Sequence, residues 1–241
     1  PEYVTLGGWF WILKGTPVYL WYTHYTMHIH LLLSGLVCKR MFAATKQSLP
    51  QYNESEKKVV PGHGIDIDFW TGNKESSLEE NSGDPKSLVS VHRLCRSKRL
   101  EIPLKSLESL PEDYTLDIYG RDVEKDYVSE LDDLVSTLKS KDRIKFNGPV
   151  PMPELLDIYH KHRLMLNMAS ETIDKTMLEG MLFGVYPVTT PGNSKAIGLP
   201  IWPNGENPED LANFIKEGEW KNYNKKYLSN IVKERHSLSA L

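Results

Sequence analysis

The chain has 241 residues, of which 40% are hydrophobic and 25% charged, so it can bury a core of ordinary size. Its formal net charge of -3 at pH 7 excludes the basic surface that binding to nucleic-acid phosphates requires, and we expect no nucleic-acid partner. The two cysteines, Cys38 and Cys95, are too few for a disulfide framework and lack the spacing of a zinc-binding pair, which predicts a cytoplasmic protein.

The first 70 residues alternate between short strands and one helix. Residues 15–37 contain no formally charged side chain, but threonines, histidines, a serine and a proline interrupt the run, so a membrane-spanning helix is disfavoured. The expected elements are strands at 17–22, 41–45 and 57–61 and a helix at 29–38. We interpret residues 1–70 as one domain and the polar stretch 71–86 as a linker.

The rest of the chain, residues 87–241, predicts a second domain in which strands and helices alternate more regularly. The pattern predicts strands at 87–91, 115–119, 144–146, 164–168 and 185–190, with helices at 103–110, 123–138 and 153–161. Such alternation is typical of a parallel sheet covered by helices on both faces. A Rossmann-like α/β domain is therefore expected, although the GxGxxG turn of the dinucleotide-binding proteins is absent from the sequence.

Two glutamates, Glu171 and Glu179, lie eight positions apart between a predicted strand and a short helix that ends near Gly184. Open α/β sheets bind ligands at the carboxyl ends of their strands. The two acids are therefore candidate site residues.

Six motifs in a fixed order resemble the retaining nucleotide-sugar glycosyltransferases of family four. They are Gly64-Ile65-Asp66 with Phe69, Arg93 with Lys98, Asp117-Ile118-Tyr119-Gly120, Ile144-Lys145-Phe146-Asn147-Gly148, Glu171 to Glu179, and Gly184-Val185-Tyr186-Pro187-Val188. The resemblance covers about residues 15 to 236 and implies the GT-B architecture of two Rossmann-like domains. It further implies a nucleoside-diphosphate-sugar donor, a saccharide or lipid-linked acceptor, no metal and no other cofactor, with the donor phosphate helping to deprotonate the acceptor.

The resemblance implies that Arg93 and Lys98 bind the donor diphosphate and act in catalysis. Cleavage of a bond between a sugar and a diphosphate develops negative charge on the leaving phosphate, which nearby cations stabilise. The alternative is a solvated basic surface, since Arg96 and Arg99 lie in the same short stretch.

By the same resemblance, Glu179 accepts hydrogen bonds from ribose hydroxyls and Glu171 contacts the donor sugar. Carboxylates only accept hydrogen bonds, so a diol is a natural partner. The alternative for Glu179 is an ion pair with Lys175 on an exposed helix face, with a stabilisation of roughly 0.3 to 0.5 kcal/mol.

The helix that begins near Asp174 is expected to point its amino end at the diphosphate, which places Asp174, Lys175 and Thr176 among the donor-binding residues. The resemblance adds Gly148 to them. Many members of the family carry Gly-Phe-Gly after the first glutamate, where this chain has Thr172-Ile173-Asp174. Asp174 as a helix cap is the alternative. For Thr176, a hydrogen bond from its hydroxyl to the backbone competes with one to phosphate.

The resemblance also places His24 against the donor sugar. Together with His28 and His30 it admits a zinc-site alternative, which we disfavour because no carboxylate lies in the segment. Aromatic residues nearby favour core or domain packing, with stacking on sugars and a peripheral contact to the inner membrane face as further hypotheses; they are Trp9, Phe10, Trp11, Tyr19, Trp21, Tyr22 and Tyr25.

The resemblance further suggests that the chain is a fragment lacking parts of both ends of the family's architecture, so that it could be inactive as given. Two other functions fit the same motifs. One is a non-catalytic module that binds nucleotide sugars, and the other is a GT-B sugar-nucleotide epimerase.

Overall fold

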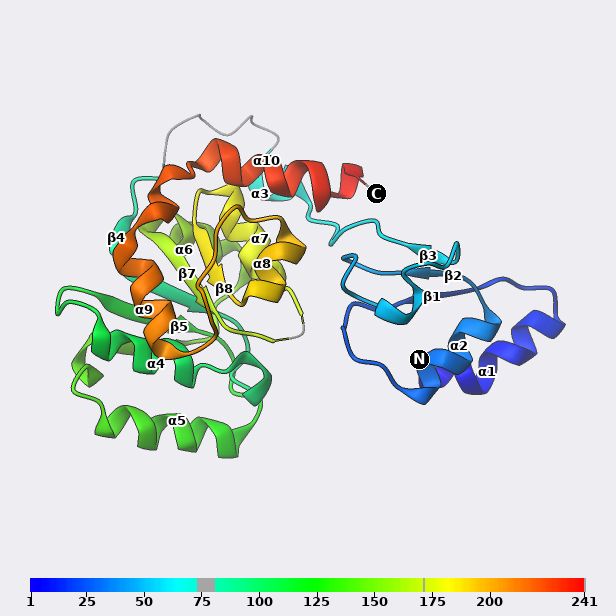
Figure 1. The fold of residues 1–241 in the computed structure, drawn as a ribbon, viewed down its shortest axis with the longest axis horizontal. Coiled ribbons are helices and arrows are strands. Elements are labelled where there is room, and N and C mark those ends of the chain that lie inside the picture. Colours follow the sequence, from blue (N-terminus) through cyan, green and yellow to red (C-terminus); the bar gives the residue numbers. More distant parts are fainter. Residues whose placement is uncertain (73–80, 171, 241) are drawn as a thin grey trace. The chain divides into compact units, whose positions relative to one another are not determined.

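The computed structural model describes residues 1–72, 81–170 and 172–240, and its chain forms two compact units. The smaller unit combines Pro1–Gly64 with Glu234–Leu241, and the larger unit is Ile65–Lys233 (Figure 1). The division therefore falls between Gly64 and Ile65, earlier than the expected linker at 71–86, of which residues 73–80 lie outside the described part.

The smaller unit contains a three-stranded parallel sheet in the order β1-β2-β3. Its elements in chain order are α1 (Glu2–Leu13), β1 (Val18–Trp21), α2 (Ile29–Val37), β2 (Cys38–Phe42) and β3 (Lys58–Val59). The buried side chains of its core are Leu20, Leu31, Cys38, Met41, Ala43 and Leu49. The predicted strand at 41–45 begins earlier, at Cys38, because Cys38 and Met41 are buried in this core while Lys39 and Arg40 between them face solvent.

Helix α1 was not expected from the sequence. Its side chains leave much apolar surface in solvent, since Trp9, Phe10 and Trp11 are each about half exposed, as are Tyr19 and Trp21 of β1. The favoured interpretation of these aromatic residues as core packing is therefore wrong for these five within the smaller unit. No helix in the described part of the chain is both long and apolar enough to cross a bilayer.

Two distant segments meet inside the smaller unit. A Cβ atom added at Gly62 would lie 2.3 Å from the backbone oxygen of Arg235, so only glycine allows this approach. The neighbouring rings also contact, with Nδ1 of His63 at 3.3 Å from Nδ1 of His236, and both side chains are buried.

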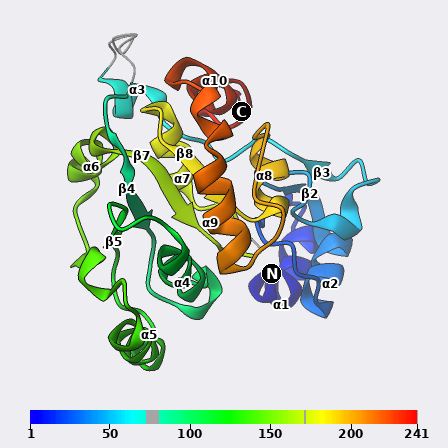
Figure 2. The ribbon, with the colours of Figure 1, turned by 60° about the vertical axis from the view of Figure 1, so that its left-hand side comes forward.

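The larger unit contains a five-stranded parallel sheet in the order β6-β5-β4-β7-β8, and Figure 2 labels four of these strands, β5, β4, β7 and β8. The strands are β4 (Asp84–Val91), β5 (Thr115–Tyr119), β6 (Ile144–Gly148), β7 (His162–Asn167) and β8 (Tyr186–Thr189). Successive residues of a strand point to opposite faces, and Leu164, Met165 and Leu166 of β7 are all completely buried. Both faces of the sheet are therefore covered, which confirms the predicted α/β class with a parallel sheet.

Helices precede, connect and follow these strands. They are α3 (Ile67–Thr71), α4 (Glu101–Ser106), α5 (Lys125–Thr137), α6 (Leu155–Lys161), α7 (Lys175–Leu182), α8 (Pro191–Ile197), α9 (Pro208–Glu217) and α10 (Lys225–Arg235). Helix α5 is amphipathic, with Tyr127 and Leu131 buried one turn apart. Residue Glu234 lies near the end of α10.

The strand order positions a ligand site. The chain runs from β4 outward through β5 to β6 and then returns to the other side of β4 to form β7 and β8. The order therefore reverses between β4 and β7, whose carboxyl ends lie at the same edge of the parallel sheet. In open α/β sheets this switch point is where ligands bind.

Candidate functional site

The loops after β4 and β7 meet at the switch point through a buried ion pair. Lys98, in the short 3-10 helix Arg96–Lys98, places its Nζ 2.5 Å from Oδ1 of Asp174. The Lys98 side chain is 3% exposed and that of Asp174 is 20% exposed. The second carboxylate oxygen, Oδ2, accepts a hydrogen bond of 2.7 Å from the side-chain amide of Asn167. Both oxygens of Asp174 are therefore engaged, and the ammonium group of Lys98 is fixed at the sheet edge.

Asp174 occupies the N-cap position of α7, but its side chain makes no capping hydrogen bond. The sequence alternative of Asp174 as a cap is therefore wrong, because Lys98 and Asn167 take its carboxylate instead. A helix whose first-turn N–H groups have no side-chain cap carries a partial positive charge at that end. The amino end of α7 thus lies next to the Lys98 ammonium group without an acidic cap of its own.

The first turn of α7 also contacts β4. The hydroxyl of Thr176 donates a 2.8 Å hydrogen bond to the backbone oxygen of Val91, the last residue of β4. Its proton is therefore used by the backbone, and only its lone pairs remain for another partner. Lys175, one residue earlier, is exposed.

His92, which belongs to none of the six sequence motifs, follows β4 directly. Its backbone N–H donates to the oxygen of Tyr119 at 3.1 Å, and its Nδ1 lies 3.1 Å from the oxygen of Arg93. The side chain is buried, and its Nε2 has no hydrogen-bond partner among the described residues. Burial lowers the pKa of this imidazole, an effect that the charge of Asp174 opposes and that of Lys98 reinforces.

Arg93 has an exposed side chain, with no hydrogen bond or ion pair to any described residue. Arg99, in contrast, contacts the loop after β7. Its Nε donates a hydrogen bond of 2.9 Å to the backbone oxygen of Met168. Asn193 of α8 holds the same loop, because its amide donates to the oxygens of Ala169 at 2.6 Å and Thr172 at 3.1 Å. These contacts join residues far apart in sequence, and no motif indicated them.

Glu179 lies one turn further along α7 and is buried. Its carboxylate accepts a hydrogen bond of 3.2 Å from the hydroxyl of Tyr159, a fully buried residue of α6. Burial raises the pKa of Glu179, while the Tyr159 hydrogen bond and the charge of Lys175 oppose the rise. The alternative of an ion pair with Lys175 on an exposed helix face does not hold, since Glu179 is not exposed and forms no such pair within the described residues.

Gly148 ends β6 with a φ of +72°, a conformation that side-chain-bearing residues rarely adopt. The backbone oxygen of Gly148 accepts a 2.9 Å hydrogen bond from the N–H of Gly120, which follows β5. The carboxyl ends of β5 and β6 are thereby held side by side.

The two remaining predicted site residues are Glu171 and His24. Glu171 falls outside the described residues. His24 belongs to the smaller unit, where its exposed ring contacts the edge of Tyr22 at 5.5 Å between centroids. Of the other two histidines, His28 lies 3.4 Å from the hydroxyl of Tyr22 through Nε2, and its ring contacts that of His30. Nowhere in the described ranges do three His, Cys, Asp or Glu residues gather as a metal site would require.

Solved structures resemble the chain over nearly its whole length at low sequence identity. The HepE protein of Anabaena, solved in complex with UDP, has a TM-score of 0.80 at 17% identity and matches 98% of this chain and 72% of its own. Sucrose-phosphate synthase from Thermosynechococcus elongatus has a TM-score of 0.74 at 15% identity, covering 98% and 69%. A glycosyltransferase from Rickettsia africae has a TM-score of 0.70 at 13% identity, covering 98% and 77%. These likenesses confirm the predicted GT-B fold class.

No curated protein matches the sequence. The family model of the glycosyl transferases group 1 matches residues 73–197, just over half of the chain, and includes the loops after β4 and β7. The chain therefore belongs to the glycosyl transferases group 1 family.

Proposed function

We propose that this protein transfers a hexose-like sugar from a nucleoside-diphosphate sugar to a hydroxyl group of a saccharide or lipid-linked acceptor. We further propose that the transfer retains the anomeric configuration and needs no metal, as in the glycosyltransferases of family four that the motifs resemble. Family membership supports the glycosyl transfer. The donor class is supported by the HepE structures, which were solved with UDP and with UDP-glucose.

One observation carries the proposal, namely the position of Lys98 beside the uncapped amino end of α7 at the switch point of the sheet. A diphosphate at this position would meet an ammonium group and the backbone N–H groups of α7. Both favour negative charge, and both favour it more as the sugar bond breaks and charge collects on the leaving phosphate. Removal of one such fixed donor typically lowers the rate about 100-fold to 1000-fold.

The remaining roles are proposed from the resemblance and fit the chemistry of the side chains. Arg93, exposed and without a described partner, would reach the same diphosphate. Glu179 would accept hydrogen bonds from the ribose hydroxyls. Glu171 and His24 would contact the donor sugar.

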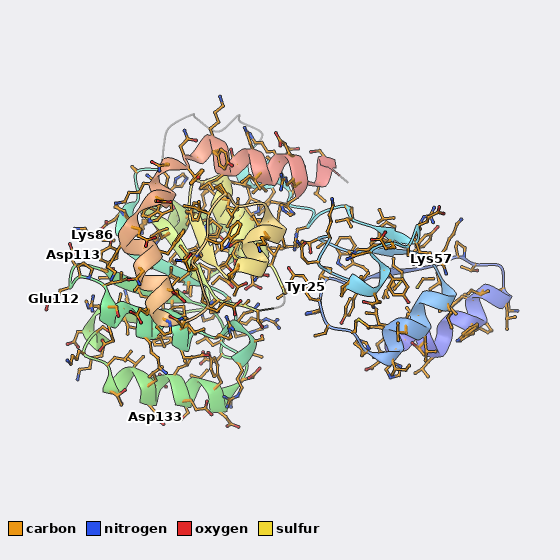
Figure 3. The ribbon with its side chains drawn as sticks, in the orientation of Figure 1. Tyr25, Lys57, Lys86, Glu112, Asp113 and Asp133 are labelled. Atoms are coloured by element: carbon orange, nitrogen blue, oxygen red, sulfur yellow. The ribbon has the colours of Figure 1, made fainter. Side chains whose placement is uncertain are left out.

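A binding screen by calorimetry tests the donor site. UDP-glucose, GDP-mannose and ADP-glucose are titrated into the wild type and into Arg93→Ala and Glu179→Gln. We expect one donor to bind clearly best and each substitution to weaken it at least tenfold, about 1.4 kcal/mol. Lys86→Ala is the matched control, because Lys86 is an exposed lysine of β4 in an ion pair with Asp113 (Figure 3).

The outcomes separate the candidate functions. If no donor binds, or if binding survives both substitutions, the proposed site is wrong. Tight donor binding without transfer to any acceptor in a saccharide panel would favour the non-catalytic binding module. Release of an epimerised sugar would favour the epimerase. For a transferred product, the coupling constant of the anomeric proton in the NMR spectrum tests retention, and undiminished turnover in EDTA tests metal independence.

A further inference from the structure

His92 is a buried side chain beside the proposed diphosphate site, and it belongs to none of the six sequence motifs. It is 7% exposed. A carbonyl oxygen only accepts hydrogen bonds, so Nδ1, at 3.1 Å from the oxygen of Arg93, carries the proton of the neutral ring. The other nitrogen, Nε2, then presents a lone pair that no described residue uses. Buried polar atoms without a partner are rare in folded proteins and mark places where a ligand can supply one.

The backbone around His92 is fixed. Its N–H is bonded to Tyr119, and a Cβ atom at Gly120 would lie 1.8 Å from the oxygen of His92, so the ends of β4 and β5 are in close contact. The residue before it, Val91, accepts the hydroxyl hydrogen bond of Thr176. His92 is therefore held next to the first turn of α7, where the diphosphate would bind.

Two charged groups act on the ring from the elements packed around it. Asp174, before α7, favours the protonated imidazole, and Lys98, from the loop after β4, disfavours it. Burial is the largest influence and also favours the neutral form, so the pKa of His92 lies below its ordinary value. A bound diphosphate would add negative charge beside Lys98 and shift this balance toward the protonated ring.

We propose that His92 is a diphosphate ligand that takes up a proton when the donor binds, so that its Nε2–H donates a hydrogen bond to a phosphate oxygen. The proton comes from the solvent and forms the new N–H bond with the Nε2 lone pair, and no other bond changes. The proposal rests on the proposed function, because it needs a diphosphate beside Lys98. It makes donor binding dependent on pH through one named residue.

Calorimetry in buffers of different ionisation enthalpy tests the proposal with the full chain. The probes are UDP-glucose, GDP-mannose and ADP-glucose, whose diphosphates are esterified at both ends and carry no proton that titrates near neutral pH. For the wild type, we expect an uptake approaching one proton per donor bound. Above the pKa of the free His92, the affinity should fall by up to about tenfold per pH unit.

Two substitutions identify the residue. Glutamine at position 92 can place an N–H near Nε2 but cannot titrate, so His92→Gln should bind the donor without proton uptake and with little dependence on pH. His160→Gln is the matched control, because His160 of α6 is a histidine of the same unit with a lowered pKa, and it should behave as the wild type.

A measurement on the wild type covers the case in which His92→Gln does not fold. In protein whose histidines are labelled with ¹⁵N, the NMR resonance of Nε2 of His92 should shift to the position of a protonated nitrogen when the donor is added. Donor binding without proton uptake, or proton uptake that persists in His92→Gln, overturns the role of His92 and leaves the proposed function standing. If none of the three donors binds, the proposed function itself fails.

Discussion

In the larger sheet, the carboxyl ends and the amino ends of the strands carry the same types of polar contact in different surroundings. Strand β4 has a Lys–Asp ion pair at each end. Lys98 and Asp174 form the buried one beyond its carboxyl end, while Lys86 and Asp113 form the other at its amino end, with both side chains about half exposed. Exposed pairs contribute little to stability, whereas the loss of one member of a buried pair leaves an uncompensated charge. Surroundings, more than the residue types, therefore separate a candidate binding group from a surface contact.

The largest expected effect comes from Lys98→Met. The substitution leaves the partly buried Asp174 without its cation and removes the proposed diphosphate ligand. We expect the free energy of unfolding to fall by about 3 to 5 kcal/mol and donor binding to be lost. Chemical denaturation and calorimetry measure the two effects.

The double variant Lys98→Met with Asp174→Asn separates stability from binding. Removal of both charges should restore much of the stability without restoring the affinity for the donor. Full donor affinity in the double variant would show that the buried pair has no part in binding.

A smaller effect is expected from the substitution of two buried asparagines, one at the carboxyl ends of the strands and one at their amino ends. Asn167, the last residue of β7, donates to the Asp174 carboxylate, and Asn81, before β4, donates to the backbone oxygens of Tyr159 and His162. Loss of either amide should destabilise the protein by about 1 to 3 kcal/mol, because buried partners lose their hydrogen bonds. Thermal unfolding of Asn167→Ala and Asn81→Ala measures this loss.

Donor affinity should distinguish the two asparagines. Asn167→Ala frees the carboxylate that fixes Lys98 and should weaken donor binding, whereas Asn81→Ala should not. Equal affinities would show that the orientation of Asp174 does not matter for the donor.

The pH dependence of stability should have opposite signs at Glu179 and Glu108. Burial raises the pKa of Glu179, so the folded protein holds its proton more tightly than the unfolded chain does. The stability that the protonated form contributes is complete below the ordinary carboxyl pKa and is lost as the pH rises through the raised value. The wild type should therefore lose stability as the pH rises through the raised pKa, and the variant Glu179→Gln should not show this loss.

Glu108, in the turn before β5, is the contrasting case at the amino edge. Hydrogen bonds, chiefly from Ser140, lower its pKa, so its contribution is present above the ordinary pKa and is lost as the pH falls through the lowered value. The wild type should therefore lose stability as the pH falls through the lowered pKa, and the variant Glu108→Gln should not show this loss. Urea unfolding of both variants between about pH 3 and pH 8 measures the two slopes, and slopes of the same sign would contradict the assignment.

The smallest effect is expected from Lys86→Met and Asp113→Asn. Both side chains are solvated, so the melting temperature and the donor affinity should match those of the wild type within error. A clear loss of donor affinity in either variant would mean that surface charge at a distance controls the site.

Local patterns predicted most of the larger sheet. The strand Thr115–Tyr119 was predicted with its observed bounds, because a β-rich run ends at a glycine. Helix α1 was missed, since its glycine pair and aromatic residues have low helix propensity and its apolar side chains follow no clear helical periodicity.

The site was only partly predictable. Motif order selected Lys98, Asp174 and Glu179, but the partner of each depends on segments that meet only in the folded chain. Asp174 and Lys98 are 76 positions apart, and nothing local shows that the carboxylate turns to the lysine instead of capping α7. His92 and Tyr159 had no sequence signal, because their significance lies in burial and in the hydrogen bonds they make or lack.

The tight contact of Gly62 with Arg235 has a consequence for the order of folding during synthesis. The segment that begins at Glu234 leaves the ribosome after every residue of the larger unit, although it belongs to the smaller one. The nascent chain can therefore complete its second unit before its first. Until that segment is synthesised, the smaller unit lacks the residues that pack beside Gly62. A stalled or prematurely released polypeptide would expose this position to chaperones or proteases.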